Sequence, residues 1–530
     1  MPAIDPRGEG VLPGRPTDSN SALVKKHRCR VKISGSVHTI DYAVESLRKV
    51  ERISLGMTGR YVCVWGFLLL LGVACAETEP GTPPPLDQLF YPTALAFAPG
   101  SIPSEDRLLV SNSNFDQRYN ASTIMALSVE QLFELANQLS FDAPIETMPI
   151  VSAKKIPSLS GEIVLAASSS ISPANKAFVT SRQGNFLTML RLESGVLACD
   201  NAGQPLVLGF DCTAGHMVDT GGSDPFALSF VPGQTGQGFI ATGHLRTTNR
   251  PREEIRPDIG IVTFTDVDLF EQRLLDEAAG QELSSPVLDV TVPTLTGVSG
   301  VSAAVATQDA SGHELLIVDL NQTAGAVSVW EISQETSSLS VKANSKLSLG
   351  TLANSFSTRG LVTTSSADRA YVSLRFSESS GAYNAGIAVL ARESSGSYAL
   401  RNVYEFGSEL GRPALLEKGN GERLLYVGDI RSDRIWILDV TSDAPLVVGE
   451  LSGRAPAEID GVAVRRRILD APSHISFISR DGRTLGFVSN FSNSTLAVID
   501  VTDPDPRNHS IIGRLGQVIE PDGTGEEDNE

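Results

Sequence analysis

Residues 471–506, APSHISFISRDGRTLGFVSNFSNSTLAVIDVTDPDP, set the fold expectation for the whole chain. The segment 480–483, Arg-Asp-Gly-Arg, has the composition of a hairpin turn, because glycine adopts a positive φ without steric cost. Short apolar runs bounded by turns are typical of strands, and three of them are expected here, at 475–478, 485–489 and 495–501. Asn490 opens a second turn, between the second and third of these strands. A fourth strand is expected at 509–515.

This pattern recurs along 91–515. The first copy reads YPTALAFAPG and then RLLVSNSNF, within 91–115. The markers near the end of each second strand are Ser111, Thr180, Ala241, Val318, Val372, Val427 and Val488. Successive markers lie 54 to 77 residues apart, which exceeds the roughly 40–50 residues of a bare four-stranded blade. We therefore predict an all-β fold, a β-propeller of about seven four-stranded blades with enlarged loops.

The last copies carry a family resemblance. The segment GFVSNFSNSTLAVID (486–500) resembles the YVTN-type repeat of bacterial seven-bladed propellers, where the second strand ends in VTN or VAN and the third reads like TVSVID. LLYVGDIRSDRIWILD (424–439) is a looser version. The resemblance implies a fold and no single activity, because propellers carry many functions.

Two short helical insertions are expected, at 128–139 and 266–277. The first begins with Ser128 and Gln131, the pair that forms a capping box. Both insertions follow a third strand, so they should lie on the outer rim. Covering a blade edge is the simpler role, and a partner-binding face is the alternative.

An export signal lies inside the chain. Residues 57–74 combine Arg60 with an apolar run too short to span a bilayer, which is signal-peptide architecture. The end, LLGVAC, resembles the lipobox of bacterial lipoproteins, with Cys75 as the lipidated residue; Gly72 stands where that family most often has leucine. The alternatives are cleavage by ordinary signal peptidase, which would release a soluble protein, and an uncleaved anchor.

The chain should then divide into five parts. Residues 1–56 would be an over-extended gene start or disordered, because a signal peptide must lead the chain; a genuine cytoplasmic extension is the alternative. After the signal peptide, 75–89 would be a proline-rich tether, 90–516 the propeller and 517–530 an acidic disordered tail. Ala76 replaces the aspartate that commonly retains such lipoproteins at the inner membrane, which favours the outer membrane of the cell envelope.

The charge balance argues against nucleic-acid binding. The chain has 62 acidic and 43 basic residues and a net charge of −19, and such a surface repels nucleic acid at long range. The run Arg465 to Arg467 is expected on an exposed loop, and it lacks the interleaved aromatic residues of a single-strand binding surface.

Cys199 and Cys212, thirteen positions apart, are expected to form a disulfide if the protein is exported. Two free buried thiols are the alternative. Trp330 and Trp436 occupy similar third-strand positions and are expected to pack within blades.

The turns after the second strands contain arginines that would gather on one face of a propeller. Unpaired, they would form an anion site; paired with neighbours such as Asp116, Glu378 or Asp433, they would not. His244 and His474 are expected near the mouth of the central channel. The candidate arginines are Arg118, Arg182, Arg246, Arg375 and Arg431.

The sequence carries no metal-ligand spacing, phosphate loop, nucleophile elbow or dinucleotide fingerprint. We expect no cofactor, and no catalytic residue is assigned. The leading hypothesis is a binding or scaffold module for a protein partner or a small anion. A propeller hydrolase resembling lactonases, with a metal or water at the channel mouth, is the alternative. A purely structural envelope protein is the third.

Overall fold

The computed structural model divides the chain into two compact units, Met1–Glu77 and Thr78–Glu530. In the first, β1 (His27–Ile33) and β2 (Ser36–Tyr42) form an antiparallel hairpin. The expected signal peptide, Cys75 and nearly all of the acidic tail lie outside the described residues. Those residues are 27–33, 36–42, 81–140, 144–167, 174–199, 210–233, 238–246, 259–281, 295–296, 300–309, 312–319, 326–335, 338–349, 356–376, 385–459 and 462–518.

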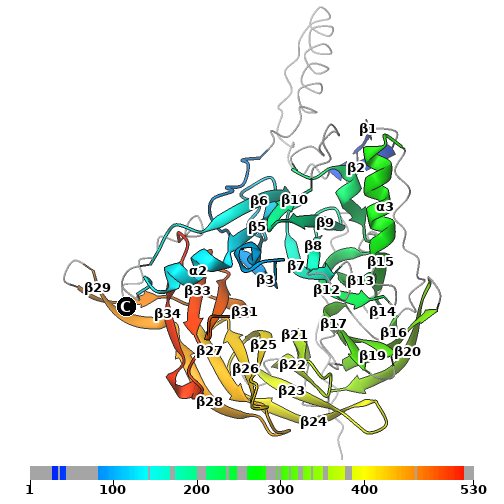
Figure 1. The fold of residues 1–530 in the computed structure, drawn as a ribbon. Helices are drawn as coiled ribbons and strands as arrows, with labels where there is room; N and C mark the ends of the chain where they lie inside the picture. The colour runs from blue at the N-terminus through cyan, green and yellow to red at the C-terminus, as the bar shows by residue number, and fades with distance from the viewer. Residues whose placement is uncertain are drawn as a thin grey trace, which may run out of the picture. The chain divides into compact units, whose positions relative to one another are not determined.

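The second unit is a seven-bladed β-propeller, in which seven antiparallel sheets surround a central axis (Figure 1). The first sheet contains β3 (Pro92–Ala98), β4 (Arg107–Asn112), β5 (Ser122–Ser128) and β6 (Ile150–Ile156). The second contains β7 (Ser160–Ala167), β8 (Ala174–Ser181), β9 (Phe186–Glu193), β10 (Val196–Ala198) and β11 (Met217–Asp219). The third contains β12 (Ser223–Pro232), β13 (Gly238–Arg246) and β15 (Val262–Asp266).

Sheets four to seven contain four strands each. They are β17 (Val301–Asp309), β18 (Gly312–Asp319), β19 (Ala326–Glu335) and β20 (Ser338–Ser348); β21 (Phe356–Thr363), β22 (Arg369–Phe376), β23 (Ala385–Arg392) and β24 (Tyr398–Glu405); β25 (Leu410–Glu417), β26 (Arg423–Asp429), β27 (Arg434–Asp439) and β28 (Leu446–Ser452); and β31 (Pro472–Arg480), β32 (Arg483–Asn490), β33 (Thr495–Asp500) and β34 (Ser510–Leu515).

The seven predicted markers are confirmed as second-strand residues, one in each sheet. These strands are apolar on both faces because neighbouring sheets pack against each of them. Leu108 and Val110 of β4, for example, share a core cluster with Leu485 and Phe487 of β32. The hydrophobic core therefore lies between the blades, and the first strand of each sheet faces the axis (Figure 1).

The ring closes by contact between the first and last sheets, because each sheet consists of consecutive strands. The Leu95 backbone N–H of β3 donates to Nδ1 of His474 on β31 at 2.7 Å. Ile145 and Leu515 form an isolated parallel bridge across the same seam. The inner strands β3 and β31 pack together at this seam, as the inner strands of the other neighbouring sheets do.

Polar side chains end several second strands and hold the chain that enters the same sheet. Asn490 accepts from the Asp470 backbone N–H at 3.3 Å and donates to the Ile468 carbonyl at 2.7 Å. Asp429 accepts from the Ser408 backbone N–H at 2.9 Å. These bonds give a physical reason for the polar residue that ends each of the segments VSN (488–490) and VGD (427–429).

Both predicted helices are confirmed, as α2 (Val129–Ala136) and α3 (Val267–Ala278). Ser128 Oγ accepts from the Gln131 backbone N–H at the start of α2, and Asp266 caps α3 in the same way. The predicted all-β propeller of seven blades is confirmed; its second sheet has five strands, and its third sheet has three among the described residues. Phe270 of α3 packs on Phe178 of the second sheet.

Among the described residues of the second unit, four short strands lie outside the seven sheets: β14 (Ile259–Gly260) pairs with β16 (Leu295–Thr296), and β29 (Arg454–Ile459) pairs with β30 (Val462–Arg467). The described residues also form single turns of 3₁₀ helix at η1 (Pro103–Glu105), η2 (Ala214–His216) and η4 (Pro506–Asn508). Within the described part of the chain, no helix is long and apolar enough to span a bilayer.

The predicted disulfide is confirmed between Cys199 and Cys212, whose Cα atoms lie 4.9 Å apart. It links the end of β10 to the segment that leads into β11, and both strands pair with β9. Trp330 is fully buried, and Trp436 packs beside Phe406 as blade packing requires.

Candidate functional site

All seven inner strands shift register near their start, and in the second and sixth sheets the shift spans two residues. In β7, pairing with β8 skips from Ser160 to Ile163, which leaves Gly161 and Glu162 out of register. In β25, pairing with β26 skips from Leu410 to Pro413, which leaves Gly411 and Arg412 out of register. Bulges re-aim side chains. Here each bulge presents one charged side chain.

The two charged side chains meet across the axis. Arg412 Nη1 lies 2.5 Å from Glu162 Oε1, although the second and sixth sheets are not neighbours in the ring. The other carboxylate oxygen, Oε2, accepts from the Leu228 backbone N–H of β12 at 3.0 Å. Glu162 therefore ties three sheets together at the centre.

His474 on β31 is the third member of this group. Its Nδ1 accepts a hydrogen bond from Leu95, so the neutral ring carries its proton on Nε2. Arg412 lies close enough to act on the ring electrostatically. We call Glu162, Arg412 and His474 the axial site.

Burial dominates the electrostatics of the axial site. It raises the pKa of Glu162, against the lowering effects of the Arg412 charge and of the hydrogen bond from Leu228. Burial lowers the pKa of His474 to about 3, and the Arg412 charge acts in the same direction. The imidazole is thus neutral at ordinary pH, and it offers an N–H donor rather than a positive charge.

Arg412 has donor capacity left over. Its side chain keeps 26% of its surface exposed, against 9% for Glu162. Among the described residues its single side-chain partner is Glu162, through Nη1. A guanidinium group has five N–H donors, so several of them point to no protein acceptor in the described part of the chain. Gly360 of β21 makes room for this side chain, because a Cβ there would lie 2.9 Å from Cα and Cγ of Arg412.

The arginines singled out in the sequence have carboxylate partners where their side chains are described. Arg375 Nη1 and Arg431 Nε contact the two oxygens of Glu409, at 3.1 and 3.2 Å. Arg182 Nε lies 3.4 Å from Asp224, and Arg118 Nε lies 3.2 Å from Asp116. The structure brings Arg375 and Arg431 together on one acid and places Arg182 in another sheet. The side chain of Arg246, at the end of β13, lies outside the described residues, as does Glu378.

The two histidines singled out in the sequence lie apart, in the third and seventh sheets. His244 is fully buried, and its Nε2 lies 3.1 Å from Thr263 Oγ1. Burial lowers its pKa to about 4, against a raising hydrogen bond to the Ser223 backbone. Within the described chain, no three His, Cys, Asp or Glu side chains gather as metal ligands would.

Part of the Arg465 to Arg467 run is described. Arg467 contacts the buried Asp433 through Nε at 2.7 Å and Asp470 at 3.4 Å. The side chains of Arg465 and Arg466 lie outside the described residues. Asp433 thereby anchors β30 to the turn after β26.

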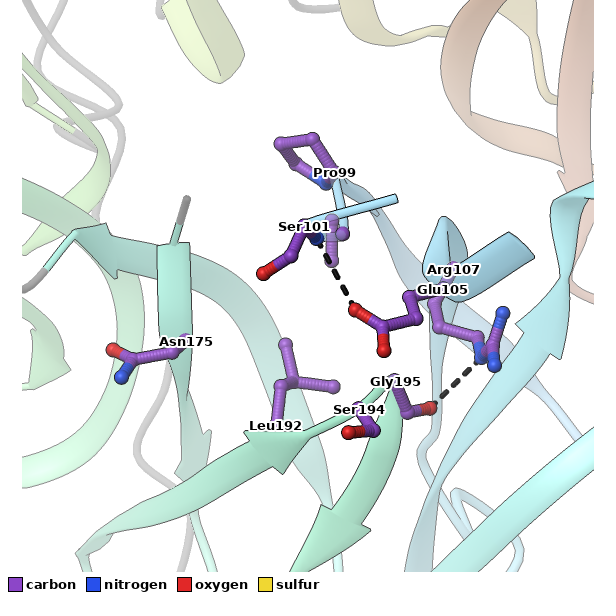
Figure 2. Close-up of a pocket in the computed structure, with 10 residues that line it drawn as sticks. Pro99, Ser101, Glu105, Arg107, Asn175, Leu192, Ser194 and Gly195 are labelled. Carbon is purple, nitrogen blue, oxygen red and sulfur yellow. Dashed lines mark hydrogen bonds between the residues drawn. The ribbon is translucent and has the colours of Figure 1, made fainter. Parts of the chain in front are cut away.

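A small pocket lies between the first two sheets, where Glu105 and Arg107 face Ser194 and Gly195 (Figure 2). Arg107 is buried, and its Nε donates to the Gly195 carbonyl at 2.8 Å while Nη1 donates to the Ser104 carbonyl at 2.7 Å. The guanidinium group therefore holds two turns together, and its Nε and Nη1 donors are used by backbone carbonyl groups.

An aromatic cluster lies at the seam of the ring. Phe115 is 56% exposed, and its ring centroid lies 5.4 Å from Phe491 and 6.4 Å from Tyr91. The Tyr91 hydroxyl donates to Asp116 at 3.2 Å. This cluster and the Glu162–Arg412 pair were not predicted as sites. The signal for the pair was present as Gly-Glu at 161–162 and Gly-Arg at 411–412, each at the start of an inner strand.

Comparisons with known proteins found similar solved structures at low sequence identity. No family model matches it, and no curated protein does. A structure of a functionally unknown protein from Desulfotomaculum acetoxidans is 11% identical and covers 76% of this chain and 96% of its own, with a TM-score of 0.44. The hydrazine synthase of Kuenenia stuttgartiensis is 10% identical and covers 81% and 99%, with a TM-score of 0.45.

Proposed function

We propose that this chain is a cell-envelope lipoprotein whose β-propeller is a non-catalytic binding module that takes a small anion at the axial site. The observation that carries the proposal is the unused donor capacity of Arg412 at the centre of the ring. His474 adds a neutral N–H donor from the neighbouring sheet. Guanidinium N–H groups form strong, charge-assisted hydrogen bonds to anions.

The axial site is a better candidate than the arginines of the turns. Arg375 and Arg431 share the Glu409 carboxylate, and Arg182 pairs with Asp224. Arg412 is also paired with a carboxylate, that of Glu162, so the difference lies in the surroundings of its guanidinium group at the axis. At the axis, an anion meets a partly buried cation in a region of low dielectric, where each charge-assisted bond is stronger than at the surface.

The anchoring part of the proposal rests on the sequence. Residues 57–74 and Cys75 would export and lipidate the chain, the tether would hold the propeller off the outer membrane, and the ring would belong to the YVTN-type repeats. Metabolic labelling with a fatty-acid analogue tests this. Label should enter the native chain and be lost in Cys75→Ala; label retained in that variant would contradict lipidation at Cys75.

Calorimetric titration of the purified protein with acetate, sulfate, phosphate and bromide tests anion binding. At least one anion should bind saturably, and a hundredfold excess over Kd should stabilise the fold by about 2.7 kcal/mol. Binding should disappear in Arg412→Gln and persist in Arg431→Gln, a matched control on the turns. Absence of binding by every anion, or equal binding by both variants, would contradict the proposal.

The aromatic cluster favours a second candidate function, docking of a protein partner at the seam. Exposed aromatic side chains on a rigid support are frequent anchors of protein interfaces, and Phe115 rests on Tyr91 and Phe491. A photo-crosslinking residue at position 115 should give a discrete adduct in the native host. The same probe at Leu275, which is 63% exposed on α3, is the control. Identical adduct patterns at both positions would contradict this function.

A further inference from the structure

The charges at the axis do not balance once an anion is bound. Glu162 and Arg412 neutralise each other in the unliganded protein. An anion at the free edge of Arg412 would add a second negative charge beside a single guanidinium group. Glu162 is only 7% exposed, so water screens this repulsion weakly. Two acids that share one buried site hold one proton between them, because both cannot stay ionised there.

We infer, on the basis of the proposed function, that the axial site binds its anion together with one proton, and that the Glu162 carboxyl holds the proton. In the balanced step, one anion and one proton enter, and the Glu162 carboxylate becomes a carboxylic acid. The net charge of the site then stays at zero. The protonated oxygen donates a hydrogen bond to the anion, which also accepts from Arg412.

The geometry selects Oε1 of Glu162 for the proton. Oε2 accepts from the Leu228 backbone N–H, and that bond survives protonation of the other oxygen. Oε1 faces Arg412 Nη1 at 2.5 Å. With a proton on Oε1, the carboxyl group can donate to an anion held at the free edge of Arg412.

Other titratable groups around Glu162 are already committed. His474 Nδ1 accepts from the Leu95 N–H at 2.7 Å, and protonation there would break that bond at the ring seam. The inner strands β3 and β12 flank β7, and β8 pairs with it. Strand β3 has no ionisable side chain. Asp224 of β12 pairs with Arg182, and Lys176 of β8 pairs with Glu271 at 2.8 Å.

Burial already raises the pKa of Glu162 in the unliganded protein. The carboxyl therefore takes up a proton more readily than an exposed glutamate does. The coupling also limits the ligand class, because the anion must be a weaker base than the Glu162 carboxylate if the proton is to stay on Glu162. Affinity should consequently fall as pH rises through the pKa of Glu162.

Titration calorimetry in two cationic buffers of different ionisation enthalpy, bis-tris and Tris, measures the protons taken up. With acetate near neutral pH we expect about one proton per anion, and above the Glu162 pKa an affinity that falls about tenfold per pH unit. Glu162→Gln mimics the protonated acid, so it should bind acetate with no proton uptake and no pH dependence. Glu409→Gln is the matched control and should keep the uptake.

The outcomes separate the two claims. Binding with no proton uptake would overturn this inference and leave anion binding standing. Uptake retained in Glu162→Gln would overturn the assignment to Glu162. Absence of binding by any anion would overturn the proposed function as well. If Glu162→Gln fails to fold, as judged by its circular dichroism, the buffer and pH series on the native protein still decides whether a proton is taken up.

Discussion

Glu162 and Arg412 lie 250 positions apart in the chain, and their side chains meet at 2.5 Å across the axis of the propeller. Each sits on a bulge behind a glycine, in sheets separated by the ring seam. This contact therefore links two sheets that are not neighbours in the ring. The same contact leaves an arginine with donors to spare.

Removing one member of the Glu162–Arg412 pair should destabilise the fold more than removing both members. Arg412→Met leaves a buried carboxylate without its cation, and we expect the free energy of unfolding to fall by about 3 kcal/mol. The double variant Glu162→Leu/Arg412→Met should recover most of that loss. Urea unfolding at neutral pH measures both. Losses that add in the double variant would show that the two side chains are not coupled.

Enlarging Gly360 should disturb ligand binding through Arg412. A Cβ at position 360 would lie 2.9 Å from Arg412 Cα and from Pro413 Cδ, so β25 must shift. We expect Gly360→Ala to weaken anion binding about tenfold, or about 1.4 kcal/mol. Gly419→Ala is the control, because a Cβ there meets nothing within 4 Å. Equal affinities in the two variants, measured by calorimetry, would argue against this supporting role.

The buried His244 should make the fold acid-sensitive. Its pKa of about 4 lies below the ordinary value of 6.5. Above pH 6.5 the His244 side chain is neutral in both the native and the unfolded state. Between pH 6.5 and 4 it binds a proton in the unfolded chain and stays neutral in the native protein. The native protein should therefore lose stability relative to His244→Gln as pH falls from 6.5 to 4, by about 1.4 kcal/mol per pH unit. Urea unfolding curves at several pH values check this, and a pH-independent difference would contradict it.

The disulfide should stabilise the second sheet. Cys199 and Cys212 close a loop of 13 residues, for which chain entropy predicts about 3 kcal/mol. The double variant Cys199→Ser/Cys212→Ser should unfold at correspondingly lower urea concentration. Reductant should lower the stability of the native protein to that level and leave the variant unchanged. A native protein insensitive to reductant under unfolding conditions would argue against the effect.

The fold was largely predictable because its signals are local. Apolar runs of strand length, turn residues such as Asp481-Gly482 and the capping residue Ser128 each act within a few positions. Seven repeats of such signals define seven sheets, and all seven second-strand markers lie where expected. The helical pattern at 266–277 likewise predicted α3, which begins directly after β15.

The axial site was not predictable because it depends on register and ring geometry. Alternation of apolar residues locates a strand, but it does not reveal a bulge at Gly161 or Gly411. The arginines of the turns stood out in the sequence, yet acids distant in the chain partner them, as Glu409 does for Arg375. His474 was expected near the channel, whereas its bond to Leu95 at the seam depends on how the ring closes.

Anomalous diffraction from crystals soaked in bromide tests the central claim most directly. Bromide scatters anomalously and is a small, monatomic anion. The account predicts an ordered bromide within hydrogen-bonding distance of the Arg412 guanidinium group and of His474 Nε2, absent from Arg412→Gln crystals treated alike. Bromide sites confined to the protein surface, with none at the axis at saturating concentration, would contradict it.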